Sequence, residues 1–120
     1  MIIAITSQGA DLSSAADPRF GRAKYFIIAD TESGGFKTVN NAQNLNAAQG
    51  AGIQAAQNVS AKGAEVVITG HVGPNAFRTL SAAGIKVVVG AEGTVAEALE
   101  KFKTGELKES DGADVEGHWV

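Results

Sequence analysis

The sequence predicts one α/β domain built on a mixed five-stranded sheet. Its 120 residues are 44% hydrophobic and 19% charged, which suits a single compact domain. Short apolar runs dominate the first 40 residues, and segments with helical periodicity alternate with such runs afterwards. We expect the domain to span residues 1–105. Residues 106–120 are acidic and carry glycine without any periodicity, so we expect them to form a flexible tail.

The first part of the chain predicts three strands. Residues 2–6 form a continuous apolar run, as expected of a central strand that is buried on both faces. Residues 25–30 and 36–40 are two further strands, and the glycine-containing turn at residues 32–35 predicts that they pair antiparallel. Residues 7–24 show no helical period, and connections of this length inside a compact domain are usually functional or mobile.

Helices and strands alternate in the rest of the domain. Residues 65–69 and 85–89 are apolar strands. The first helix carries apolar residues at helical spacing and ends at Gly63. The second begins at Pro74 and ends at Gly84, since proline suits the first turn and glycine the C-terminus. The third begins with the capping box of Thr94 and Glu97, and Gly105 ends it.

This order of elements predicts the topology. An antiparallel meander followed by two right-handed strand–helix–strand crossovers fits the spatial strand order 3-2-1-4-5, with only the second strand reversed. Helices then cover both faces, which is the three-layer α/β/α, ribonuclease H-like layout. The carboxyl ends of the other strands share one edge of the sheet, and ligands of open α/β sheets bind at such an edge.

The loop at residues 69–74 is the first candidate site at this edge. Gly70 and Gly73 permit close backbone approach, and the amides at the start of the following helix favour an anion. The His71 imidazole can bind a metal when neutral and an anion when protonated. The alternative is that His71 only caps the loop and the glycines serve the turn.

Two further segments are candidates. Arg19 and Arg22 flank a Phe-Gly corner and offer planar donors to a polyanion, with Asp17 placed to orient one of them. The alternative is a local Asp–Arg turn with Phe20 in the core. The amide-rich segment that includes Asn41 and Asn44 can hydrogen-bond a ligand, although asparagine is also an ordinary turn residue and this interpretation is favoured.

Composition excludes several classes of function. No cysteine is present, so the chain has no disulfide, thiolate-held iron–sulfur cluster or thiol nucleophile. The net charge of −3 argues against nucleic acid as a partner, and no apolar run approaches the roughly 20 residues of a membrane span, so we expect a cytoplasmic protein.

Catalytic patterns are missing as well. The first and fourth strands end in threonine rather than in the carboxylates of a ribonuclease H-type nuclease, and neither a nucleophile-elbow nor a Walker motif is present. The sequence therefore favours a binding or carrier protein over an enzyme.

From residue 2 to residue 102 the sequence resembles a known family, the dinitrogenase iron–molybdenum cofactor biosynthesis family of small proteins. The resemblance rests on motifs in a characteristic order and spacing: the Ile-Ile-Ala-Ile-Thr strand, the Phe20-Gly21-Arg22 corner, the Asn-rich turn, Gly50-Ala51-Gly52, the run from Val66 to Gly70 with Gly73, and Gly84-Ile85-Lys86-Val87. It implies a ribonuclease H-like fold and a non-catalytic role in binding or carrying iron–sulfur or molybdenum-containing clusters.

Taken together, these features predict a metallocluster carrier that binds its cargo transiently. We expect His71 to be the metal ligand, and the cluster to contact the set Arg19, Arg22, Asn41, Asn44, Gly70, His71 and Gly73. Its partners would be cluster-assembly or acceptor proteins, and the protein a monomer or weak homodimer. His118 is the tail's one histidine. The alternatives are a small-anion or nucleotide sensor domain, and a protein-interaction module that binds no cluster.

Overall fold

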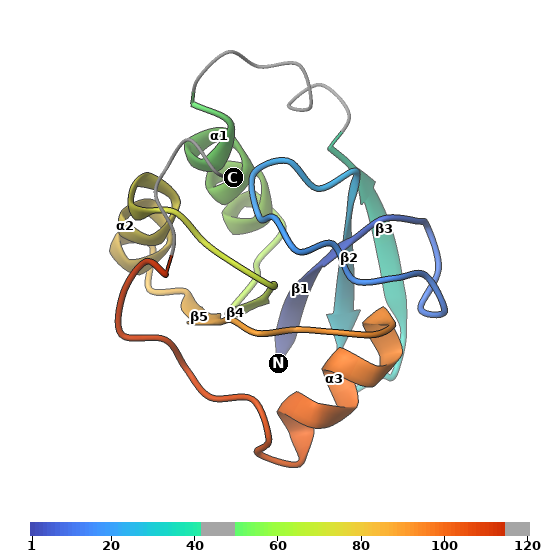
Figure 1. The fold of residues 1–120 in the computed structure, drawn as a ribbon. Coiled ribbons are helices and arrows are strands. Elements are labelled where there is room, and N and C mark those ends of the chain that lie inside the picture. Colours follow the sequence, from blue (N-terminus) through green and yellow to red (C-terminus); the bar gives the residue numbers. More distant parts are fainter. Residues whose placement is uncertain (42–49, 115–120) are drawn as a thin grey trace.

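A mixed sheet with the strand order β3-β2-β1-β4-β5 forms the middle layer of the molecule (Figure 1). The structure is a computed structural model that describes residues 1–41 and 50–114. β2 pairs antiparallel with β1 and β3, whereas β4 pairs parallel with β1 and β5. The predicted order and the reversed second strand are therefore confirmed. The strands are β1 (Ile2–Ser7), β2 (Tyr25–Asp30), β3 (Phe36–Asn40), β4 (Val66–Ile68) and β5 (Lys86–Val88).

Helices lie on both faces of this sheet. They are α1 (Ala51–Ala61), α2 (Pro74–Ala82) and α3 (Val95–Lys103). α1 and α2 pack on one face and α3 on the other (Figure 1). The alternation of side chains along β1 explains the two cores: Ala4 faces α1 and α2, while Ile3 and Ile5 face α3, and all three are fully buried.

Local capping signals set the helix ends as the sequence predicts. Thr94 Oγ1 accepts the Glu97 N–H at 3.1 Å, and the Glu97 carboxylate accepts the Thr94 N–H at 2.9 Å. Pro74 is the first residue of α2, and the glycine after α1 and α2 has a positive φ. None of the helices within the described ranges has the length and hydropathy that a membrane crossing requires.

The segment after α3, where composition predicts a flexible tail, makes contacts with the rest of the domain. Leu107 packs against the core beneath α3, and the Ser110 N–H donates to the Val87 carbonyl at 2.7 Å. β5 is an edge strand whose outer backbone groups need partners, and the segment supplies them. Residues 107–114 thus run along the sheet edge toward the loop after β4. Residues 115–120, including His118, lie outside the described residues.

Candidate functional site

Two loops meet at the carboxyl end of β1 and β4. The His71 N–H donates to the Pro18 carbonyl at 2.7 Å, and the Phe20 N–H donates to the His71 carbonyl at 3.3 Å. These bonds make a short parallel bridge between Arg19 and His71. The structure therefore brings together two candidate residues that are 52 positions apart in the chain (71 − 19).

Gly70 makes this meeting of loops possible. A Cβ atom at this position would lie 2.6 Å from Pro18 Cα and 2.7 Å from the Pro18 carbonyl oxygen. Both are backbone atoms, so no side-chain rotation can relieve the clash. Gly70 thus allows two segments of the protein to lie in close contact with each other. Gly73 has a different role, because it is the buried N-cap residue of α2.

A buried polar layer lies beneath the two loops. Thr6 Oγ1 donates to the Asp17 carbonyl at 2.7 Å and shares a second hydrogen bond with Thr69 Oγ1 at 3.0 Å. Both hydroxyl groups are inaccessible to solvent and link the ends of the two central strands. In the sequence, Thr6 and Thr69 stand at the strand ends where a ribonuclease H-type nuclease would carry carboxylates. In the structure they tie the base of the site to the sheet.

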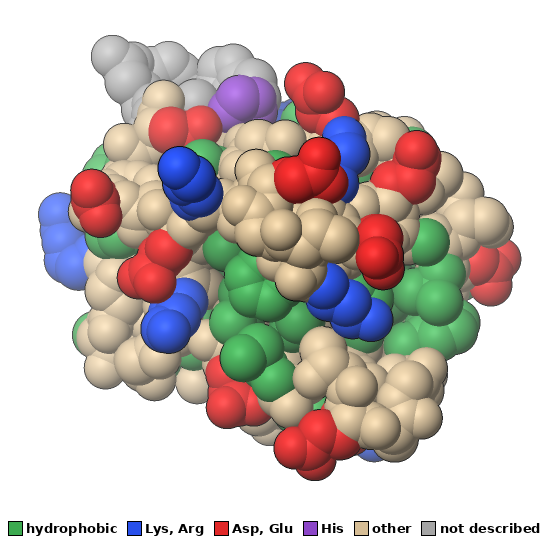
Figure 2. All heavy atoms as spheres, turned by 90° about the horizontal axis from the view of Figure 1, so that it is seen from below, with side chains coloured by type: hydrophobic (Ala, Val, Ile, Leu, Met, Phe, Trp, Pro, Cys, Tyr) green, Lys and Arg blue, Asp and Glu red, His purple; other side chains and the backbone are tan. Residues whose placement is uncertain are grey.

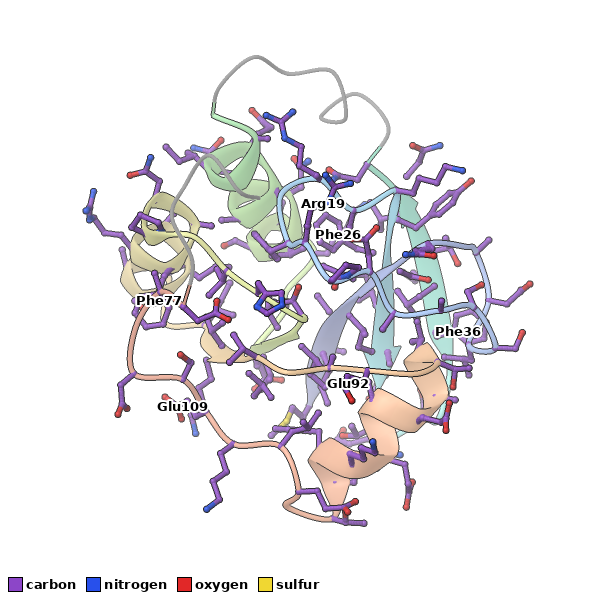
Figure 3. The ribbon with its side chains drawn as sticks, in the orientation of Figure 1. Arg19, Phe26, Phe36, Phe77, Glu92 and Glu109 are labelled. Atoms are coloured by element: carbon purple, nitrogen blue, oxygen red, sulfur yellow. The ribbon has the colours of Figure 1, made fainter. Side chains whose placement is uncertain are left out.

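Asp17 forms the local turn that the alternative interpretation described. Its Oδ1 accepts the Arg19 backbone N–H at 2.9 Å. Burial raises the pKa of the Asp17 carboxyl, and this hydrogen bond and the Arg19 charge oppose the rise. Phe20 is fully buried, with its ring centroid 5.5 Å from that of Phe26. The Arg19 side chain is exposed on the loop after β1 (Figure 3).

His71 is paired with a carboxylate that sequence reasoning missed. Its Nδ1 lies 2.8 Å from Asp114 Oδ2, while Asp114 Oδ1 accepts the Val72 N–H at 2.7 Å. The Asp114 N–H donates back to the Val72 carbonyl at 3.1 Å. The two side chains stay partly exposed, at 41% for His71 and 29% for Asp114. Only the acidic composition of the tail hinted at such a partner.

The other predicted residues have mixed outcomes. Asn41 is fully buried, and its Nδ2 donates to the Ala23 carbonyl at 2.8 Å and the Gly21 carbonyl at 3.3 Å. It therefore supports the loop that carries Arg22, which is half-buried. Asn44 lies outside the described residues.

The donor atoms limit what this site can bind. Within residues 1–41 and 50–114 no group of three His, Asp or Glu side chains is placed to hold a metal ion. The chain as a whole has no cysteine. Among the described residues, this edge carries the His71 imidazole paired with a carboxylate, the exposed Arg19 on the adjoining loop, and the half-buried Arg22. Arginine and imidazole N–H groups are hydrogen-bond donors that suit an anion.

Charged side chains of both signs lie on other parts of the surface (Figures 2 and 3). Glu92 lies on the loop before α3 and Glu109 on the segment along β5, each away from Arg19 (Figure 3). On the face seen in Figure 2, acidic and basic side chains are interspersed around a central group of apolar ones. That face therefore presents no continuous basic surface.

Comparison with known proteins places the chain in a family. The model of the family described as "dinitrogenase iron–molybdenum cofactor" matches residues 1–105. The chain belongs to this family. The match covers every strand and helix described above, so the family fold and the candidate site lie within the matched region.

Solved structures of related proteins agree with this membership in the dinitrogenase iron–molybdenum cofactor family. The apo form of the orange protein from Desulfovibrio gigas is 42% identical, with a TM-score of 0.93, over 95% of this chain and 96% of that one. A protein from Thermotoga described as a putative NifB protein is 48% identical, with a TM-score of 0.80, over 90% and 91% of the two chains. A sequence relative, an uncharacterised protein of Methanocaldococcus jannaschii, is 28% identical over 93 residues, which are 76% of this chain and 79% of that protein.

Proposed function

We propose that this member of the iron–molybdenum cofactor family is a non-catalytic carrier of an anionic metallocluster, of the iron–sulfur or iron–molybdenum type, which it binds transiently. The observation that carries the proposal is the His71–Asp114 pair beside Arg19. A histidine whose other ring nitrogen donates to a carboxylate is the arrangement that metal-ligating histidines use. The family match supports a connection with cofactor assembly.

His71 is the proposed metal ligand. When the neutral imidazole donates its Nδ1 hydrogen to Asp114, the lone pair lies on Nε2, which is the atom that would coordinate a metal of the cluster. The Asp114 carboxylate fixes the orientation of the ring. One imidazole ligand in a chain without cysteine holds a cluster weakly, which suits a protein that passes its cargo on.

The arginines supply the electrostatic part of binding. Sulfide-bridged clusters are anionic, and a guanidinium donates several hydrogen bonds in one plane to such a group. Arg19 is exposed next to His71, and Arg22 lies on the loop that Asn41 supports. A carrier of this kind works with cluster-assembly or acceptor proteins as partners.

Anaerobic reconstitution tests the proposal. Apo protein is mixed with iron, sulfide and molybdate, and absorption and EPR spectra are followed for the wild type, His71→Ala and His118→Ala. We expect saturable, coloured binding that His71→Ala weakens by about tenfold to a hundredfold and that His118→Ala leaves unchanged. Far-ultraviolet circular dichroism checks that both variants fold. Equal binding by wild type and His71→Ala would move the site elsewhere, and no binding by the wild type would refute the carrier function.

A small-anion sensor is the second candidate function. The Asp114 carboxylate accepts hydrogen bonds from His71 Nδ1 and from the Val72 N–H. An oxyanion ligand could accept hydrogen bonds from the same two groups. Calorimetric titration with molybdate or phosphate tests this candidate. Saturable binding of one of these anions by a colourless protein that takes up no cluster would favour the sensor.

A further inference from the structure

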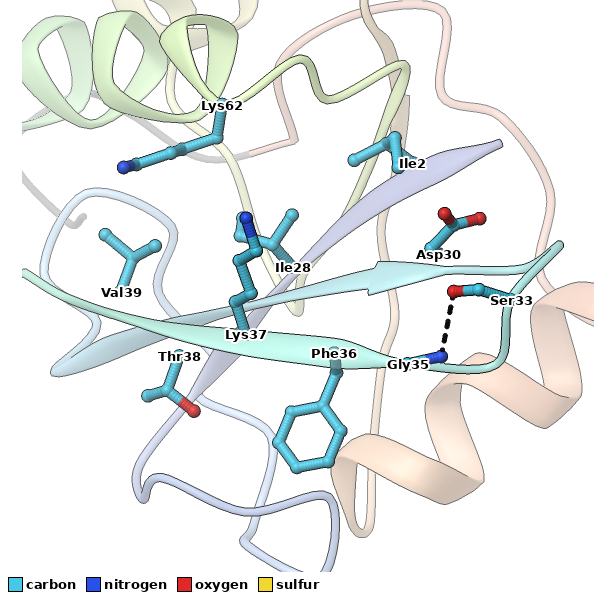
Figure 4. A pocket seen from close by; sticks show the side chains of 10 residues that line it. All are labelled: Ile2, Ile28, Asp30, Ser33, Gly35, Phe36, Lys37, Thr38, Val39 and Lys62. Carbon is cyan, nitrogen blue, oxygen red and sulfur yellow. Dashed lines mark hydrogen bonds between the residues drawn. The ribbon is translucent and has the colours of Figure 1, made fainter.

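A groove lies on the side of the sheet that α1 only partly covers. Ile2, Ile28 and Val39 form its apolar floor, and its volume is about 460 Å³. Lys37 from β3 and Lys62 from the end of α1 reach into the space above this floor (Figure 4). The groove lies over the β2–β3 half of the sheet and shares no residue with the His71 site, so a ligand of the groove is independent of the cargo.

The two lysines at one end of the groove favour a negative partner there. In the part of the chain that the structure describes, neither the Lys37 nor the Lys62 ammonium lies within ion-pair distance of a carboxylate. The molecule as a whole has a net charge of −3, yet these two cations stand over an apolar floor. Asp30 also lines the groove, but it lies beside Ile2 and Ser33, at the end away from Lys62 (Figure 4). An acidic group held beside this end of the groove would complement the two cations.

The edge of β3 specifies the shape of that partner. The Asp30 N–H donates to the Gly35 carbonyl and the Asn41 N–H donates to the Lys24 carbonyl, which fixes the alternation along β3. Backbone groups of the odd-numbered residues therefore face β2, and those of Phe36 and Thr38 face away from the sheet. No described residue bonds these outward groups. They form the template on which an added strand pairs.

We propose that β3 and this groove bind an extended segment of a partner protein, in which acidic residues alternate with apolar ones. The segment adds to the sheet as a sixth strand next to β3. Its acidic side chains lie on the α1 side, where they pair with Lys37 and Lys62. Its apolar side chains lie on the opposite face, beside the exposed Phe36 ring (Figure 4). A second copy of this chain is a poorer occupant, because pairing of two β3 strands would bring the lysines of both copies together.

Peptide titration followed by amide NMR tests this proposal. The probe is a short capped peptide in which glutamate alternates with valine, and its counterpart carries lysine instead of glutamate. We expect the acidic peptide to shift the amide signals of Phe36 and Thr38 in a saturable manner. The lysine peptide should produce no such shift. Absence of saturable shifts with the acidic peptide would overturn the proposal. The role of the two lysines would then be to prevent edge-to-edge aggregation through β3.

Charge reversal gives the sharpest version of the experiment. The double variant Lys37→Glu/Lys62→Glu should lose affinity for the acidic peptide about fivefold or more and gain affinity for the lysine peptide. Lys108→Glu is the matched control, since it makes the same kind of change at an exposed residue on the segment along β5. Equal losses in the double variant and in this control would refute a specific role for the groove.

Proline substitution separates strand addition from charge attraction. Phe36 is the first residue of β3 and its N–H faces outward, so Phe36→Pro removes an edge donor without breaking the ladder to β2. Phe36→Ala controls for loss of the exposed ring. We expect Phe36→Pro to abolish peptide binding and Phe36→Ala to retain it. Sedimentation measures self-association of the free protein. Self-association that becomes stronger in the Lys37→Glu/Lys62→Glu variant would overturn the proposal in favour of a second copy.

Discussion

The contact between Gly70 and Pro18 decides whether the candidate site can assemble. An alanine Cβ at position 70 would lie 2.6 Å from Pro18 Cα and 2.7 Å from the Pro18 carbonyl oxygen. That same carbonyl accepts the His71 N–H at 2.7 Å. Because both clashing atoms belong to the backbone, Gly70→Ala must push the loop after β1 away from the loop after β4. The substitution therefore separates Arg19 from His71.

The expected cost follows from these contacts. Overpacking a close-packed site costs about 1–3 kcal/mol, and loss of a backbone hydrogen bond costs about 0.5–1.5 kcal/mol. The two effects overlap, since movement of the loop relieves the clash by breaking the bond. We therefore expect Gly70→Ala to lower the free energy of unfolding by about 3 kcal/mol. Domains of this kind are stable by about 5–15 kcal/mol, so the variant should still fold.

Urea denaturation followed by circular dichroism measures this change. Gly35→Ala is the matched control, because a Cβ there meets only the Ser33 Oγ at 3.5 Å, which is an ordinary contact. We expect the control to stay within about 0.5 kcal/mol of the wild type. Gly70→Ala should also weaken cluster binding in the reconstitution assay, whereas Gly35→Ala should not. Equal stability of the two variants would refute the view that Gly70 holds the loops together.

Further substitutions probe the remaining contacts. Asp114→Ala should weaken cluster binding by about tenfold, since the His71 ring loses the carboxylate that orients it; tighter binding in the same titration would show that this carboxylate competes with the cargo. Asn41→Ala should cost about 2 kcal/mol in urea denaturation, because two buried carbonyl groups lose their donor. Thr94→Ala should cost about 1 kcal/mol through loss of the helix cap. Burial raises the pKa of Asp17 above its ordinary value of 3.8, so the folded state binds that proton more tightly than the unfolded state does. Its contribution to stability therefore falls as the pH rises from 3.8 through the raised pKa, and Asp17→Asn should remove this decline in urea titrations at several pH values.

Local signals explain why so much of the fold could be predicted. The capping box at Thr94, the proline at the start of α2 and the glycines after the helices each act over a few residues. The apolar runs and the hairpin turn then leave few topologies that satisfy right-handed crossovers. The predicted strand order follows from these constraints and is the one observed.

The candidate site was less predictable because its residues act through contacts between distant segments. The sequence predicts that Gly70 leaves room for a ligand, but the neighbour at that position is Pro18 of another loop. It also predicts a ligand contact at Asn41, yet this side chain is fully buried and bonds to carbonyl groups of the loop before β2. A sequence contains no signal that distinguishes these roles, since the same residue types serve both.

The sequence by itself determined the order of the elements, the caps that bound them and the edge of the sheet where the candidate residues gather, because periodicity and capping are properties of neighbouring residues. Tertiary structure alone decided that Asp114 pairs with His71, 43 residues earlier in the chain. That pairing depends on the course of residues 107–114, which run along β5 because an edge strand leaves backbone groups without partners. The partner of the imidazole was therefore set by an unpaired strand edge, which only the assembled sheet creates.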